Sequence, residues 1–322
     1  MSTRHAMLRL RARLYTHIRA FFEARDVLEV ETPILSRAGN TDPNIASFAL
    51  EFSGPQQAGP RQRWLRTSPE FALKRLLAEG LGDCYELGRV FRNGEAGGRH
   101  NPEFTLLEWY RVGWDQHRLC EETIALVVEA MALVGRAPSS VRKVDFATLY
   151  REAFGFDPHT ADVESLRAAL GAIAIDPAGL EREDWLDLLM THRLQPTFAP
   201  DAITVVHDWP ATQCALARVR PAAAAGAPPV AERFELYLGP LELANGYHEL
   251  NDATEQRQRF ERDLALRRRR GEVLPPIDEA LLAALPGLPD CAGVALGIDR
   301  LLMALGSTPR IAEVLAFEFA RA

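Results

Sequence analysis

A glycine-rich segment with basic residues at both ends could bind a polyphosphate. It spans Phe91 to Phe104 and reads FRNGEAGGRHNPEF, with Arg92 near its start and Arg99 and His100 after paired glycines. Glycine lets the backbone approach a bulky anion closely, and the fork of N–H donors on arginine matches phosphate oxygens. We therefore predict a hairpin loop that closes over a polyphosphate.

Two glutamates in the C-terminal third could hold a cation. Glu242 and Glu249 are seven residues apart, which would place them on opposite faces of one continuous strand. Asn245-Gly246 between them is a strong hairpin signal, and a tight turn there would set Glu242 across from Glu249. Carboxylates so placed repel unless a cation lies between them, and hard oxygen ligands with phosphate suit Mg²⁺. The alternative is two surface glutamates on an edge strand.

A third candidate lies at a predicted helix start. The run from Trp64 to Glu70 indicates a strand followed by a helix, with Ser68 as N-cap and Pro69 in the first helical position. Glu70 would then lie in the first turn. There it could simply favour the helix dipole, or it could face a cationic substrate.

The elements that position these residues can be predicted from periodicity. Apolar residues at helical spacing predict a helix over about 6–25, followed by a short strand over 27–33 that ends at a proline. Alternation predicts strands on both sides of the glycine-rich loop and again in the C-terminal third, and Arg220–Pro229 is predicted to be an exposed loop. The predicted strands are 84–91, 103–112, 234–238 and 241–250, the predicted helices are 119–134, 164–194 and 253–270, and residues 291–303 are predicted to form a glycine-rich strand that runs into a helix.

Composition restricts the class of protein. The 322 residues are 47% hydrophobic, with no apolar run long enough to cross a membrane and no apolar signal core, so we expect a cytoplasmic protein. The four cysteines are scattered, which favours reduced thiols over structural zinc. The net charge of −7 does not suggest nucleic acid, and the basic run Arg267–Arg270 is interpreted as a solvated helix face.

Three of these segments together resemble the class II aminoacyl-tRNA synthetases, specifically the lysine branch. The glycine-rich loop resembles motif 2, the helix and strand over 6–33 resemble motif 1, and Gly293–Arg300 resembles motif 3. The resemblance implies an α+β fold with an antiparallel sheet flanked by helices. It also implies one catalytic domain over 1–322, with a mainly helical insertion at about 119–200, and a homodimer formed through motif 1.

The resemblance implies that the chain forms an acyl-adenylate from ATP. Such chemistry asks the protein to position groups and neutralise charge. Arg92 would meet the α-phosphate and the attacking carboxylate, Arg300 would hold the β- and γ-phosphates, and Phe104 would stack on adenine opposite Arg300. Arg99 and His100 are weaker candidates for the same phosphates, since His100 could equally stabilise the turn. The implied ATP-binding residues are Arg92, Asn93, Gly94, Glu95, His100, Asn101, Phe104, Glu242, Leu243, Gly297 and Arg300, with Mg²⁺ on Glu242 and Glu249.

The substrate pocket implied by the resemblance is acidic. Three carboxylates and a phenol around one pocket make sense for a cationic substrate, so we expect it to hold the two ammonium groups of a diamino acid. The residues that match this role are Ser68, Pro69, Glu70, Glu108, Tyr110, Asn245, Glu249 and Ala295.

Two features separate the chain from lysyl-tRNA synthetases. It begins directly at motif 1, so no room is expected for an anticodon-binding domain, and Ala295 stands where the lysine branch has a glycine. Both features resemble the stand-alone paralogues, the elongation factor P–(R)-β-lysine ligases, which implies (R)-β-lysine and elongation factor P as partners rather than tRNA. One departure is Gly94, which replaces the usual glutamate of motif 2, with Glu95 following it. The alternatives are a truncated enzyme that charges tRNA or another small acceptor, and a non-catalytic regulatory paralogue.

Overall fold

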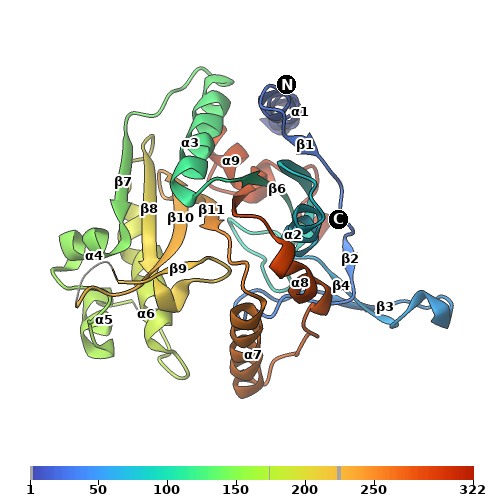
Figure 1. The fold of residues 1–322 in the computed structure, drawn as a ribbon. Coiled ribbons are helices and arrows are strands. Elements are labelled where there is room, and N and C mark those ends of the chain that lie inside the picture. Colours follow the sequence, from blue (N-terminus) through green and yellow to red (C-terminus); the bar gives the residue numbers. More distant parts are fainter. Residues whose placement is uncertain (1–2, 174, 223–225) are drawn as a thin grey trace. The chain divides into compact units, whose positions relative to one another are not determined.

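The computed structural model describes residues 3–173, 175–222 and 226–322 (Figure 1). Residue contacts divide the chain into two compact units. Unit 1 comprises Met1–Trp114 and Glu249–Ala322, and unit 2 comprises Asp115–His248. Each unit combines a mostly antiparallel sheet with helices, so the predicted α+β class is confirmed. The prediction of a single catalytic domain with an insertion stays a prediction.

The sheet of unit 1 carries both predicted flanks of the glycine-rich loop. Its strand order is β1 (Leu28–Glu29), β5 (Cys84–Phe91), β6 (Glu103–Val112) and β12 (Cys291–Gly297). Only the β1–β5 pair is parallel; β6 pairs antiparallel with both β5 and β12. The two strands predicted around the loop are confirmed to the residue, whereas the predicted strand over 27–33 is reduced to Leu28–Glu29.

Helix α1 (Thr3–Glu23) packs its apolar face on this sheet. Leu14, Ile18 and Phe22 are fully buried, and the Phe22 ring stacks on Tyr85 of β5 with centroids 4.4 Å apart. A polar contact fixes the helix to α9 (Ile298–Leu305): Arg11 pairs with buried Asp299, whose other oxygen accepts the Thr105 N–H at 2.7 Å. The strand predicted to run into a helix over 291–303 is thereby confirmed.

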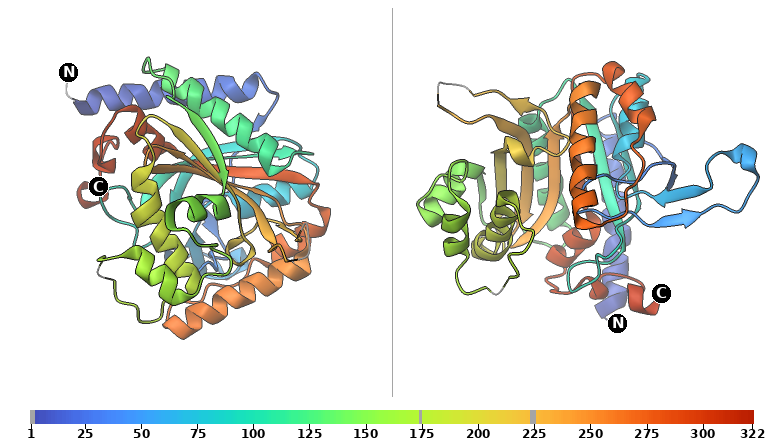
Figure 2. Two further views of the ribbon diagram at one scale, coloured as in Figure 1. Left: turned by 90° about the vertical axis from the view of Figure 1, so that its left-hand side faces the viewer. Right: turned by 90° about the horizontal axis from the view of Figure 1, so that it is seen from below.

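Further elements of unit 1 surround this core. Strands β2 (Leu35–Ser36), β4 (Gln62–Leu65) and β3 (Ala49–Glu51) form a small antiparallel sheet that extends away from the rest of the unit (Figure 2). The helices are α2 (Glu70–Ala78), α7 (Ala253–Arg270) and α8 (Glu279–Ala284). The prediction of a solvated face for the whole run 267–270 is wrong at Arg267. This side chain is buried and donates to the carbonyls of Thr41 and Ile45 at 2.9 and 2.8 Å, because the loop after β2 needs donors for its turned backbone.

Unit 2 contains the remaining strands and helices. Strand β8 (Ile203–Pro210) lies between parallel β7 (Val141–Asp145) and antiparallel β10 (Val230–Leu238), which pairs in turn with β11 (Leu241–His248) and β9 (Val219–Arg220). Its helices are α3 (Gln116–Ala132), α4 (Phe146–Phe154), α5 (Val163–Leu170) and α6 (Arg182–Leu189). Asp115, Asp145 and Asp162 cap α3, α4 and α5 by accepting backbone N–H groups.

Two predictions in unit 2 need correction. The continuous helix over 164–194 is wrong: α5 ends at Gly171, and α6 begins at Arg182 and passes into a π-helical turn over Met190–Leu194. Glycine at a helix end favours termination, and the apolar periodicity resumes too soon to reveal the break. The loop predicted over 220–229 begins one residue later than predicted, because Arg220 still belongs to β9. Residues 223–225 of this loop lie outside the described residues.

None of the helices in the described parts of the chain has the length and apolarity that a bilayer-spanning helix requires.

The contact between α1 and α9 should be measurable as stability. Asp299→Ala is expected to lower the free energy of unfolding by about 3 kcal/mol, because it leaves the Arg11 guanidinium without its partner and the Thr105 N–H without an acceptor. Urea denaturation checks this, with exposed Arg9→Ala on the same helix as the control. Equal midpoints for the two variants would contradict it.

Candidate active site

One face of the unit 1 sheet collects predicted site residues. In the β6–β12 ladder Tyr110 pairs with Gly293 and Glu108 with Ala295. Directly paired residues project from the same face of a sheet. Beside β6, therefore, β12 presents only small side chains, and this leaves space above Glu108 and Tyr110.

Gly293 is a site residue that the sequence analysis missed. A Cβ at this position would lie 2.3 Å from Tyr110 Cε1 and 2.4 Å from Glu249 Oε1, distances that real atoms do not tolerate. Glycine is therefore required here if the side chains of Tyr110 and Glu249 are both to lie against the backbone of β12. The signal was present in the glycine-rich strand of motif 3, but the sequence did not show which glycine faces the pocket.

Glu108 is the buried centre of this face. Its Oε2 accepts the Ser68 hydroxyl at 2.7 Å and its Oε1 accepts the Tyr110 hydroxyl at 2.8 Å. Burial and then the negative charge of Glu70 raise the pKa of Glu108 to about 8, although its hydrogen bonds from Ser68 and Tyr110 lower it. Ser68 also accepts the Glu70 N–H at 2.9 Å; the helix begins at Glu70, one residue later than predicted.

A lysine that the sequence analysis did not select holds the other two carboxylates. Lys74 Nζ lies 2.5 Å from Glu70 Oε1 and 2.6 Å from Glu249 Oε2, and the lysine is 2% exposed. Burial alone would lower its pKa, but the charges of Glu249 and Glu70 outweigh burial and raise it. In the sequence, Glu70 and Lys74 look like an ordinary surface pair four residues apart on a helix.

A second internal cation neutralises the neighbouring carboxylate. Arg66 Nη1 lies 2.6 Å from Glu86 Oε1, and the Thr32 hydroxyl donates to Glu86 Oε2 at 2.7 Å. Arg66 and Glu86 are both buried. This pair therefore adds no net charge to the face.

Two separate sets of contacts involve the residues predicted to bind ATP in and beside the glycine-rich loop. Arg92 Nη1 lies 3.6 Å from Glu95 Oε1, and its guanidinium carbon lies 5.2 Å from the centre of the Phe104 ring. Glu95 rather than Gly94 thus accompanies the arginine, and Gly94 has a φ of +86° that favours glycine. At the far side of the loop, Arg300 Nη2 and His100 Nε2 are 2.7 Å apart.

Asn101, predicted to bind ATP, makes structural hydrogen bonds. Its Nδ2 donates to the Glu103 carbonyl at 2.7 Å, and its Oδ1 accepts the Phe319 N–H at 3.0 Å. The side chain is buried. Its contacts tie the loop to the C-terminal segment.

The predicted turn at Asn245-Gly246 is wrong. Both residues lie within continuous strand β11, where Asn245 pairs with Glu235 and Gly246 with Phe234 of β10. The tight turn is instead Gly239-Pro240, with Gly239 at a φ of +56°. Pairing with β10 outweighed the local turn preference, so Glu242 does not sit across a hairpin from Glu249.

Asn245 and a missed carboxylate, Glu235, belong to a polar cluster in unit 2. The buried Arg233 guanidinium donates to Asn245 Oδ1 at 3.2 Å and pairs with Glu235 at 2.5 Å. Burial raises the pKa of Glu235 to about 7, although Arg233 lowers it, and the charge of Glu242 adds to the rise. Arg233 is therefore the cation that compensates Glu235 in this cluster.

The donor sets differ in how well they fit a metal ion. The described residues contain no cluster of three or more His, Cys, Asp or Glu side chains suited to a metal. Glu249 fits poorly, because the Lys74 ammonium already lies 2.6 Å from its Oε2 and would repel a divalent cation. Glu235 fits poorly for the same reason, because the Arg233 guanidinium lies 2.5 Å from its Oε1, and Glu242 stays the predicted Mg²⁺ ligand.

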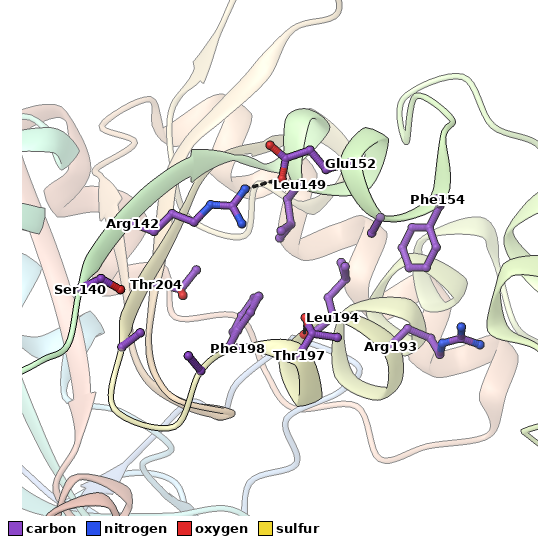
Figure 3. Close-up of a pocket in the computed structure, with 13 residues that line it drawn as sticks. Ser140, Arg142, Leu149, Glu152, Phe154, Arg193, Leu194, Thr197, Phe198 and Thr204 are labelled. Carbon is purple, nitrogen blue, oxygen red and sulfur yellow. Dashed lines mark hydrogen bonds and ion pairs between the residues drawn. The ribbon is translucent and has the colours of Figure 1, made fainter.

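A cavity elsewhere in unit 2 does not include any predicted site residue. Figure 3 shows it between α4 and the segment 193–204, with Arg142 and Glu152 paired at its edge. Its volume is about 520 Å³.

Comparison with known proteins decides the family. Residues 2–321 match the family model of class II tRNA synthetases (D, K and N). The chain belongs to this family. It is 46% identical to the elongation factor P–(R)-β-lysine ligase of Vibrio cholerae serotype O1, over 98% of this chain and 96% of the relative. Ligases of the same name from Pseudoalteromonas translucida (44%) and Klebsiella pneumoniae strain 342 (43%) cover 98% and 97% of this chain, and 96% and 94% of their own lengths.

Membership of the class II synthetase family confirms the resemblance drawn from the three motifs. In this chain the strand that follows motif 2, β6, pairs along its length with β12, which carries motif 3. That pairing places Ala295 and Gly297 of motif 3 beside Glu108 and Leu106, on the strand that follows the glycine-rich loop.

The raised pKa of Glu108 predicts a pH dependence of stability. Glu108 binds its proton up to about pH 8 in the folded chain but only up to about 4.5 when unfolded, so its contribution to the free energy of unfolding falls as pH rises through this window. Glu108→Gln should remove that fall. Its stability relative to wild type should therefore increase by at least about 1 kcal/mol from pH 5 to pH 8 in urea denaturation. The control is exposed Glu103→Gln on the same strand; parallel curves for Glu108→Gln and wild type would contradict the assignment.

The close approach at Gly293 predicts a strong effect of one methyl group. Gly293→Ala should push Tyr110 or Glu249 aside, lower the free energy of unfolding by about 1–3 kcal/mol and weaken lysine binding at least tenfold. Calorimetric titration with lysine, alongside thermal unfolding, measures both effects. Unchanged binding would show that the pocket does not use this contact.

Proposed function

We propose that this chain activates (R)-β-lysine with ATP and transfers the β-lysyl group to a lysine ε-amino group of translation elongation factor P. The observation that carries the proposal is the acidic cluster formed by Glu70 with buried Glu108, Tyr110 and Glu249. It occurs in a class II synthetase family member whose glycine-rich loop, called the phosphate loop below, leads into the strand of Glu108 and Tyr110. The names of the relatives, at 42–46% identity over nearly the whole chain, support the choice of substrate and acceptor.

The acidic cluster suits a substrate with two ammonium groups. Glu108 and Tyr110 project from the sheet face, and Lys74 holds Glu70 and Glu249 together. Buried carboxylates attract cations strongly because little water screens them. Ser68 and Pro69, at the start of α2, and Ala295, opposite Glu108, complete the proposed pocket. Asn245 stays a proposed substrate-binding residue, as predicted from the sequence.

The phosphate loop suits the activation step. A carboxylate oxygen of the amino acid attacks the α-phosphorus of ATP, and pyrophosphate leaves. Arg92 is proposed to neutralise charge on the α-phosphate, with Phe104 under its guanidinium offering a ring face to adenine. Arg300 and His100, which lie together, are proposed to hold the β- and γ-phosphates. The acceptor amine then attacks the carbonyl carbon, and AMP leaves.

Magnesium is proposed to bind Glu242, one of the pair Glu242 and Glu249 predicted from the sequence. A bound Mg²⁺ would neutralise phosphate charge during activation. The class II synthetase family, to which the chain belongs, supports the use of ATP that such an ion would accompany. The remaining ATP contacts, from Asn93, Gly94, Glu95, Leu243 and Gly297, stay as predicted.

A homodimer and a cytoplasmic location are also proposed. Leu28 of the motif 1 segment and Ile34 and Leu35 just after it are 51%, 40% and 50% exposed, and a second copy of the chain could cover these apolar side chains. Transfer RNA is not proposed as an acceptor.

The direct test is ATP–pyrophosphate exchange with (R)-β-lysine and α-lysine side by side, followed by mass spectrometry of elongation factor P. We expect faster exchange with (R)-β-lysine and a mass increase on one lysine of the acceptor. Exchange with α-lysine together with charging of tRNA would favour the truncated synthetase. No exchange with either lysine would favour the regulatory paralogue.

Ala295 is expected to shape the amine end of the pocket. Ala295→Gly should shift the ratio of kcat/KM toward α-lysine by about ten- to two-hundred-fold, because a methyl group in a pocket is worth roughly 1–3 kcal/mol. The matched control is Ala292→Gly, since Ala292 lies on the opposite face of the same strand. An unchanged ratio would assign Ala295 to strand packing alone.

A further inference from the structure

Lys74 occupies an unusual place for a lysine. It lies on α2, four residues after Glu70, and its side chain is 2% exposed. Its Nζ contacts Glu70 on its own helix and Glu249 in the C-terminal third of the sequence. Because lysine is rarely buried completely, this position calls for a reason.

The two contacts limit the separation of two carboxylates. Lys74 Nζ is 2.5 Å from Glu70 Oε1 and 2.6 Å from Glu249 Oε2. The two oxygens therefore lie no more than about 5.1 Å apart, the sum of these distances. Without a cation between them, two carboxylates this close would repel each other in a site that water barely screens.

Stability alone is a weak reason for such an arrangement. Burying charged groups costs free energy that their attraction often does no more than recover, and apolar residues of similar volume usually serve the core as well. Leu73 and Leu77 on the same helix are buried in the ordinary way. A buried cation between two carboxylates that face a proposed ligand site favours a role in binding.

Charge balance supports the same reading. With Glu108 ionised, as a bound ammonium group beside it would favour, Glu70, Glu108 and Glu249 carry three negative charges, and Lys74 reduces this to two. The Arg66–Glu86 pair contributes none. Two net negative charges match the two ammonium groups of a diamino acid, and the substrate carboxylate is then left for the arginines of the phosphate loop.

We propose that Lys74 is a positioning residue that fixes the spacing of Glu70 and Glu249 and thereby selects substrates with two ammonium groups. This inference rests on the proposed function in one respect, that the acidic cluster holds a diamino acid. It does not depend on which lysine isomer is activated or on the acceptor.

The principal test is Lys74→Met, which keeps the length of the side chain and removes its charge. We expect the KM for (R)-β-lysine or α-lysine in ATP–pyrophosphate exchange to rise at least tenfold, while the KM for ATP changes less than twofold. Arg75→Met, an exposed position on the same helix, is the matched control and should leave both constants within twofold of wild type.

A second readout separates positioning from a general structural defect. Norleucine lacks the side-chain ammonium of lysine, so the ratio of its inhibition constant to that of lysine measures selection for the second ammonium. Lys74→Met should reduce this ratio at least fivefold, whereas a misfolded or loosened pocket would weaken both ligands equally. An unchanged ratio, or an unchanged KM for lysine, would overturn the proposal.

A conservative variant covers the case in which Lys74→Met does not fold. Lys74→Arg keeps the positive charge but places a wider guanidinium between the carboxylates. We expect a thermal midpoint within a few degrees of wild type and a KM for lysine at least tenfold higher. Normal KM in this variant would overturn the proposal.

Failure of the proposed function can be told apart from failure of this inference. If wild type does not catalyse exchange with any amino acid, the function fails, and calorimetric titration of lysine into wild type, Lys74→Arg and Arg75→Met still tests the role of Lys74. Loss of lysine affinity in Lys74→Arg alone would support it; equal affinities in all three would overturn it.

Discussion

Carboxylates buried beside one another must be compensated, and much of unit 1 is arranged around this requirement. Glu86 and Glu108 project from the central sheet, and Glu70 and Glu249 join them from outside it. Arg66 compensates the first, hydroxyl groups hold Glu108, and Lys74 holds the other two. Because isolated buried charge is so costly, removing any one partner should disturb the others. The face therefore acts as one electrostatic unit, to which we propose that a cationic substrate binds.

Space on this face is determined as strictly as charge. On this face strand β12 carries only small residues, which are Cys291, Gly293, Ala295 and Gly297. At Gly293 even a single methyl group would collide with Tyr110 and Glu249. The absence of side chains on one strand thus permits large polar side chains on the next strand and around it. Charge and volume are in this way matched across a single ladder.

The phosphate-binding side depends on contacts far from the loop itself. Asp299, next to Arg300, is held by Arg11 of α1 and by the backbone of Thr105. These contacts fix the start of α9 against β6, and with it the base of the Arg300 side chain. Asn101 performs a similar task for the loop by binding Phe319 near the C-terminus. Both ends of the chain thereby help to order residues proposed to hold ATP.

The sequence by itself determined the strands around the glycine-rich loop and helix α7. These follow from local alternation, capping and residue type, which do not require knowledge of distant contacts. Tertiary structure alone decided that Asn245-Gly246 lies within a strand, since pairing with β10 overrides a local turn preference. It alone joined Lys74 to Glu249 and set Gly293 against Tyr110, because spacing along a chain does not show which residues meet across a sheet or beyond one helix.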